Sequence, residues 1–190
     1  GDWSSDVYSS DLQTLSRKRP EETHMVRSIV ALILLIINAA PIIAQEKTWQ
    51  AGVAKTVITP REYMWMSGYG ARTAPADGKE TDLWAKAMVL EAADGKRLVL
   101  VTLDLVGVSR EVSQKICGIL QDKHKLPREA IALSVSHTHC GPVVGSNLRS
   151  LLSFDEVQGK LVDDYTAKLP GLILKAVDDA AASLGPVTLS

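Results

Sequence analysis

The chain has 190 residues and a formal net charge of -1, from 21 Lys and Arg against 22 Asp and Glu. Hydrophobic residues make up 46% and charged residues 23%, which excludes a disordered chain, because disorder needs low hydrophobicity and high net charge. No basic excess is available to neutralise phosphates, so nucleic acid is excluded as a general partner, and two cysteines are too few for a disulfide framework.

The N-terminal stretch differs in character from the rest of the chain. Residues 1–24 are polar, rich in serine and aspartate and without a lasting period, so we interpret them as a non-native leader; the alternative is a native cytoplasmic extension. From Met25, the expected true start, a positive residue and a short apolar run precede the small residue Ala44. This pattern predicts a cleaved signal peptide over residues 25–44, since a membrane anchor needs about 20 apolar residues. We therefore expect an exported protein, secreted or periplasmic, with its domain over residues 45–190.

The expected domain is mixed α/β, with flanking helices on a sheet. In chain order, the hydrophobic pattern predicts strands at 51–57, 84–91 and 97–104, a helix at 110–124, a strand at 130–136 and a helical region at 155–183. Asp94-Gly95 is a hairpin signal, and Ser109 can cap the first helix. Pro170-Gly171 is expected to interrupt the last helical region, which Gly185-Pro186 ends. The residues from Pro186 to Ser190 resemble the start of a further strand.

The densest chemical signal is the segment 136–142, Ser-His-Thr-His-Cys-Gly-Pro, at the end of a predicted strand. Ligands of open α/β sheets lie at the carboxyl ends of strands. Residues i and i+2 of an extended segment point to the same side, so His137 and His139 can face one site. Neutral imidazole is a good zinc ligand, and catalytic zinc takes three protein ligands plus water. Spacing alone leaves open both metal binding and a role as exposed or hydrogen-bonded histidines.

Three further side chains lie near this motif or could join its chemistry. Asp104 ends the buried strand 97–104, and either orients a ligand histidine through its free ring nitrogen or caps the following turn. Cys140 either binds a soft metal, acts as a nucleophile or simply fits a tight turn. Cys117 is expected in the core, and sequence alone does not decide whether the two cysteines pair.

Each remaining candidate has a purely structural interpretation as well as a functional one. Trp65 and Tyr69 in the glycine-rich loop either line a pocket or pack in the core. His124 ends a predicted helix, where a cation suits the dipole, and is expected to be exposed. Asp163-Asp164 is expected to lie on a solvated helix face.

Four features in this order resemble the neutral/alkaline (non-lysosomal) ceramidase family over about residues 48–190. They are the opening strand at 51–60, the Met-Ser-Gly-Tyr-Gly loop at 66–70, the following strand pair, and the histidine motif. The family hydrolyses the amide bond of ceramide to sphingosine and a fatty acid with a catalytic zinc. The resemblance implies Zn²⁺ as the cofactor, His137 as a zinc ligand and His139 as the histidine that assists the chemistry. It also implies a ceramide-like or other amide lipid as the substrate, met by peripheral contact with a membrane surface.

Two departures bear on this resemblance. Cys140 replaces the usual serine, and Val143-Val144 follows the proline where the family has glycines, so the substrate stays open. The family's second zinc histidine, its glutamate and tyrosine ligands and its active-site serine lie downstream in longer chains, and no histidine follows His139 here. We therefore expect the incomplete N-terminal portion of a larger zinc-hydrolase domain, inactive alone. The alternatives are a non-catalytic exported domain or another His-x-His metallohydrolase, such as an amidohydrolase barrel or a metallo-β-lactamase.

Overall fold

The computed structural model describes residues 48–188, so the expected leader and signal peptide lie outside the described residues. In chain order the elements are β1 (Trp49–Val57), β2 (Trp84–Glu91), β3 (Arg97–Leu103), α2 (Arg110–His124), η1 (Arg128–Ala130), β4 (Ile131–Val135), η2 (Arg149–Leu151), α3 (Glu156–Ala182) and β5 (Gly185–Val187). The predicted strands and helices are confirmed, with ends that differ by a residue or two. The expected further strand at the C-terminus is β5.

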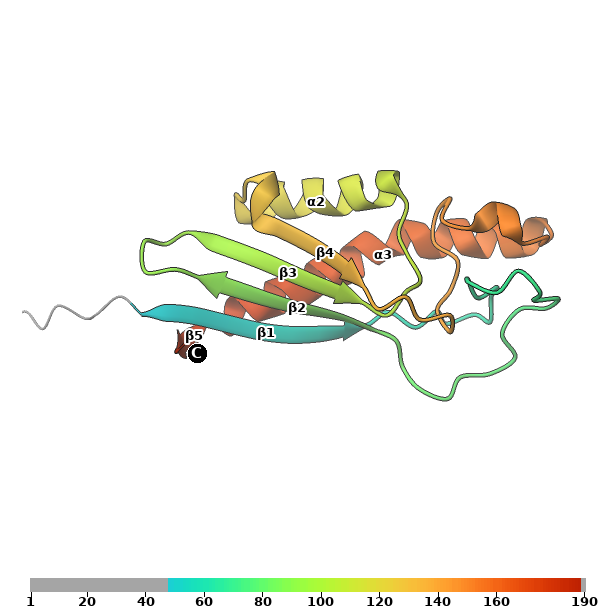
Figure 1. Ribbon diagram of the computed structural model, residues 1–190, viewed down its shortest axis with the longest axis horizontal. Helices are drawn as coiled ribbons and strands as arrows, with labels where there is room; N and C mark the ends of the chain where they lie inside the picture. Colours follow the sequence, from blue (N-terminus) through green and yellow to red (C-terminus); the bar gives the residue numbers. More distant parts are fainter. Residues whose placement is uncertain (1–47, 189–190) are drawn as a thin grey trace, which may run out of the picture. The chain divides into compact units, whose positions relative to one another are not determined.

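The strands form one mixed sheet in the order β4-β3-β2-β1-β5. β3 and β4 are parallel, with Leu103 opposite Val135, and the other neighbouring pairs are antiparallel. β1 therefore runs in the same direction as β3 and β4. The loops that follow these three strands leave the sheet at the same edge (Figure 1). The predicted mixed α/β sheet with flanking helices is confirmed.

Both helices cover the same face of the sheet and contact each other (Figure 1). Alternate residues of β2 and β3 point to this face and are buried: Ala85, Ala87, Val89, Val99, Val101 and Leu103. The other face is uncovered within residues 48–188, and Val53 on it is 68% exposed. A hydrophobic core thus forms on one side of the sheet only, in the part of the chain described.

The long helix α3 crosses β1 at backbone contact. A Cβ added at Gly52 would lie 1.9 Å from the carbonyl oxygen of Ala180, so only glycine allows this approach. Further along, the Tyr165 hydroxyl donates to the carbonyl of Ile58 at 2.7 Å. Burial of Tyr165 raises the pKa of its hydroxyl well above the ordinary value. These contacts fix α3 against the segment that leads from β1 into the first loop.

α2 begins and ends as its sequence predicts, but its last residue is less exposed than expected. Ser109 Oγ accepts from the Val112 amide, and the backbone amide of Glu111 holds the pKa of that residue's own carboxyl below its usual value. The prediction that His124 is exposed is wrong: its side chain is 12% exposed, and Nε2 lies 3.1 Å from Asp178 Oδ1. α3 supplies this carboxylate from 54 residues away in sequence.

α3 is continuous, so the predicted interruption near Pro170-Gly171 is wrong. A proline inside a helix costs about 3 kcal/mol, because it lacks an amide donor and crowds the preceding turn. Leu169, Ile173 and Val177 around it are fully buried, and each such side chain contributes about 1.5–3 kcal/mol by leaving water. The buried stripe therefore outweighs the cost of the proline.

The opposite side of α3 is solvated, as predicted for the acidic pair. Asp163 forms an ion pair with Arg149, and Asp164 forms one with Lys160. Both carboxylates are about half or more exposed, so these pairs contribute little to stability. No helix within residues 48–188 is both long and apolar enough to span a bilayer.

Candidate active site

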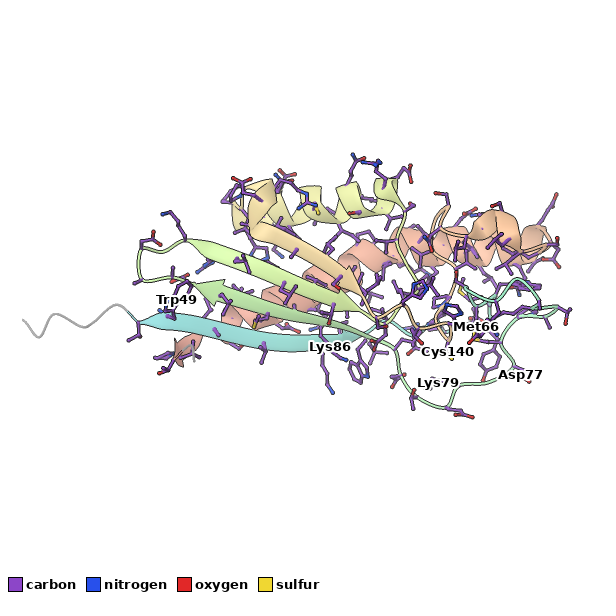
Figure 2. The ribbon with its side chains drawn as sticks, viewed as in Figure 1. Trp49, Met66, Asp77, Lys79, Lys86 and Cys140 are labelled. Carbon is purple, nitrogen blue, oxygen red and sulfur yellow. The ribbon has the colours of Figure 1, made fainter. Side chains whose placement is uncertain are left out.

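The candidate site lies where the loops after β1, β3 and β4 meet at one edge of the sheet (Figure 1). The loop after β1 carries the glycine-rich segment, and the loop after β4 carries both histidines. Met66 pairs with Pro142 in an isolated antiparallel bridge. The Ser67 amide donates to the Gly141 carbonyl at 2.9 Å. Figure 2 shows Met66 and Cys140 together at this end of the sheet, with Trp49 at the other.

His137 stands at the start of the site in a strained backbone conformation. Its φ is 58°, which a non-glycine residue adopts at a cost of about 1–3 kcal/mol. The ring lies 3.0 Å, measured from Nδ1, from the carbonyl oxygen of Val106 in the loop after β3. The parallel pairing of β3 and β4 brings these two loops together. The exposed imidazole thus has one nitrogen fixed by the backbone and Nε2 free for a ligand.

The glycine-rich loop covers His139. A Cβ at Gly68, whose φ is 111°, would lie 2.5 Å from Cγ of the His139 ring. The Tyr69 ring packs edge-on with a centroid distance of 4.5 Å. Arg72 Nη2 donates to the His139 carbonyl at 2.6 Å. His139 Nδ1 is buried and has no hydrogen-bond partner among the described residues.

The structure brings the two predicted histidines together, with ring centroids 5.1 Å apart. An imidazole that is exposed, with Nδ1 against a carbonyl oxygen and Nε2 free, fits one ligand position of a zinc site. Residues 48–188 contain no group of three His, Cys, Asp or Glu side chains placed to hold a metal. His137 therefore suits a metal, but the described part of the chain does not supply a complete catalytic set.

The contacts of the Asp104 side chain match neither of its two predicted roles, because they join it to β2 and not to a histidine or to the following turn. Its Oδ2 accepts from the Trp84 amide at 3.0 Å and lies 4.0 Å from Lys86 Nζ. It thereby ties the end of β3 to the start of β2. The backbone carbonyl of Val106, which no side-chain pattern in the sequence reveals, holds His137 instead.

In the structure one cysteine is buried and the other is exposed, and the same holds for the two aromatic residues of the glycine-rich loop. Cys117 is buried in α2, as expected, and Cys140 is exposed beside the histidines; both are free thiols. The Thr138 hydroxyl accepts from the Cys140 amide at 3.3 Å, which closes a tight turn. Trp65 is buried in the core, whereas Tyr69 is 58% exposed and contacts His139.

Two clefts flank the segment that leads from β1 to the glycine-rich loop. The larger, about 1150 Å³, lies between this segment and α3 and is lined by neither histidine. The smaller, about 500 Å³, adjoins the site, because Met66, Cys140 and Pro142 line it. Its opposite wall includes Asp77 and Lys79, which lie near Cys140 in Figure 2.

Two site residues had no distinct signal in the sequence. Arg72 lies a few residues after the glycine-rich loop, and only the folded structure shows it donating to the His139 carbonyl. Gly68 belongs to a recognised loop, but its close approach to the His139 ring follows from the docking of two loops far apart in sequence.

Comparison with known proteins relates this chain to one protein family. Residues 49–190 match the family model described as neutral/alkaline non-lysosomal ceramidase, N-terminal. Neutral ceramidase of Pseudomonas aeruginosa is 28% identical over 166 residues, which cover 83% of this chain and 24% of that protein. Neutral ceramidase 3 of Arabidopsis thaliana is 27% identical over 144 residues, which cover 74% of this chain and 19% of that protein.

Solved structures agree with the sequence comparison. The crystal structure of the neutral ceramidase from Pseudomonas aeruginosa superposes with a TM-score of 0.58 at 28% identity, covering 73% of this chain and 22% of that one. A structure described as ceramidase complexed with C2 gives a TM-score of 0.56 at 29% identity, with the same coverage. The chain thus spans about a quarter or less of the length of these relatives.

Proposed function

Because the chain belongs to the neutral/alkaline non-lysosomal ceramidase family, we propose that it is the N-terminal part of a zinc-dependent amide hydrolase that acts on ceramide-like lipids. The observation that carries this proposal is the pair His137 and His139 at the shared edge of the sheet, inside the matched region. In the proposed reaction, water adds to the amide carbonyl and the C–N bond breaks. The acyl group leaves as a fatty acid, and the amine takes up a proton as sphingosine.

Each histidine has a role in this proposal that its surroundings support. His137 would hold the zinc through Nε2, because its Nδ1 is engaged by the Val106 carbonyl. When bound, zinc polarises the amide carbonyl and lowers the pKa of water. His139, 5.1 Å away between ring centroids, would donate a hydrogen bond to the carbonyl oxygen as negative charge develops on it.

The rest of the zinc site is proposed to come from residues beyond Ser190. A catalytic zinc takes three protein ligands and water, and no group of three suitable side chains occurs within residues 48–188. By family resemblance the missing groups are a histidine, a glutamate and a tyrosine, together with an active-site serine. The chain alone is therefore proposed to be inactive.

An amide lipid is supported as the substrate by the cleft beside the histidines. Met64, Met66 and Leu83 give it an apolar side, and its volume is about 500 Å³. Methionine side chains adapt their shape to irregular apolar ligands. The same substrate would place this end of the molecule at a membrane surface.

Export is a separate proposal, which rests on the signal-peptide pattern over residues 25–44. N-terminal sequencing of the protein recovered from its natural host tests it. A mature N-terminus immediately after Ala44 supports export, whereas a protein that begins at Gly1 in the cytoplasm contradicts it.

The enzymatic proposal is tested by reading the source gene beyond codon 190. A continued frame with the missing ligands is then expressed and assayed for release of fatty acid from ceramide, with zinc removed by a chelator and restored. Activity that depends on zinc and falls on His137→Ala, but not on the control His124→Ala, supports the proposal. A stop codon at 190 contradicts it for this chain and leaves a non-catalytic exported domain.

A further inference from the structure

The rings of His137 and His139 have different neighbours at Nδ1. These neighbours determine which ring nitrogen carries the hydrogen of the neutral imidazole. His137 Nδ1 lies 3.0 Å from the carbonyl oxygen of Val106. A carbonyl only accepts hydrogen bonds, so Nδ1 of the neutral ring must be the nitrogen that carries hydrogen. Nε2 of His137 then presents a lone pair.

His139 has the reverse arrangement. Its Nδ1 is buried without an acceptor among the described residues, whereas Nε2 is not one of the buried unpaired atoms of this half-buried ring. Nδ1 has no partner in either tautomer, but a buried N–H without an acceptor is rarer in proteins than a buried acceptor without a donor. A hydrogen on Nε2 stays available to water or to a ligand. The neutral ring is therefore favoured with its proton on Nε2.

The segment from Gly68 to Arg72 keeps His139 in this position. The His139 ring packs closely on the backbone of Gly68, since a Cβ there would lie 2.6 Å from Nδ1. Tyr69 packs edge-on against the ring, and the Arg72 guanidinium lies over the Tyr69 ring at 5.1 Å. Arg72 also donates to the His139 carbonyl. Backbone and ring of His139 are thus fixed by one short loop.

We propose that His137 and His139 are held in opposite neutral tautomers, and that Gly68–Arg72 is the positioning element that fixes the tautomer of His139. This assignment deepens the proposed function, on which its catalytic meaning rests. One ring would offer a lone pair to a metal, while the other would offer an N–H to the substrate carbonyl. The tautomers themselves follow from contacts within this chain.

Nuclear magnetic resonance tests the proposal without substrate or metal. The 190-residue chain, labelled with ¹⁵N at histidine and freed of metal by a chelator, is observed near pH 9, where ordinary imidazoles are neutral. His137→Gln and His139→Gln assign the two rings. We expect His137 to show the pattern of a proton on Nδ1 and His139 that of a proton on Nε2. Nitrogen shifts averaged between tautomers in either ring, or a proton on the other nitrogen, would overturn the assignment.

The positioning role is tested with tyrosine variants. Tyr69→Ala is expected to move the two nitrogen signals of His139 toward each other, as the ring gains freedom, and to leave His137 unchanged. Tyr69→Phe keeps the ring contact and should preserve the signals. Tyr63→Ala is the matched control, because Tyr63 and Tyr69 are both 58% exposed. An unchanged His139 in Tyr69→Ala, or an equal change in Tyr63→Ala, contradicts the positioning role whether or not the longer protein hydrolyses amides.

Discussion

Replacing Gly68 by alanine tests the close packing of the glycine-rich loop on His139. The new Cβ would lie 2.5 Å from Cγ of the histidine ring, well inside contact distance, and φ at this position is 111°. Backbone strain of a non-glycine residue contributes about 1–3 kcal/mol, and overpacking contributes about 1–3 kcal/mol more. Because Cγ lies on the axis of the Cβ–Cγ bond, turning the imidazole about that bond cannot relieve the clash. We expect Gly68→Ala to lower the free energy of unfolding by about 3 kcal/mol.

Gly70→Ala in the same loop is the matched control, since nothing lies within 4 Å of a Cβ built at Gly70. Its effect should stay within about 0.5 kcal/mol. Urea unfolding followed by circular dichroism measures both variants. With a denaturant slope of about 2 kcal/mol per molar, the Gly68→Ala midpoint should fall by about 1.5 M. If the two variants unfold at the same urea concentration, the loop does not pack on His139 as described.

Three further predictions concern the pH response, the helix caps and the metal. Above about pH 10 the free energy of unfolding should fall by up to about 1.4 kcal/mol per pH unit, because burial raises the pKa of Tyr165 and only the unfolded chain releases this proton. Tyr165→Phe should remove this contribution to the pH dependence of the free energy of unfolding, measured by urea unfolding between pH 9 and 11. An unchanged pH dependence would contradict the burial argument. Asp155→Ala should cost about 1 kcal/mol and Ser109→Ala less, because the cap bond of Asp155 is 2.8 Å and that of Ser109 is 3.5 Å; thermal unfolding that ranks them in reverse order would refute this reasoning. Calorimetric titration with Zn²⁺ should show about tenfold or greater weakening in His137→Ala and no change in His124→Ala, and equal affinities in the two variants would argue against His137 as a ligand.

Local patterns predicted most of the fold. Asp94-Gly95 connects two runs of apolar residues, and the hairpin of β2 and β3 follows directly from them. Ser109 marks the start of α2, as the structure confirms. The expected interruption at Pro170 does not occur, because the rule for proline considers the helix alone. Its cost is offset by burial against the sheet, which depends on residues far away in sequence.

The site could be predicted only in part for a related reason. The spacing of His137 and His139 placed both at the end of a strand, and the structure brings the rings together. The partner of His137 is a backbone carbonyl, at Val106, and every residue carries such a group, so no pattern points to it. Asp104, the more conspicuous candidate for that role, is used to join two strands. Contacts made by the backbone are the part of a site that sequence patterns do not show.

The bridge between Met66 and Pro142 has a consequence for the order of folding. The β2–β3 hairpin closes over a few residues, so its entropy loss is small and it can form early. The bridge closes a loop of more than seventy residues and depends on the sheet being in place. We therefore expect the glycine-rich loop and the histidine loop to join last and to separate first, in a local opening that leaves the core folded. Amide hydrogen exchange would then be faster at Ser67 and Val143, whose amides join the loops, than in β2 and β3.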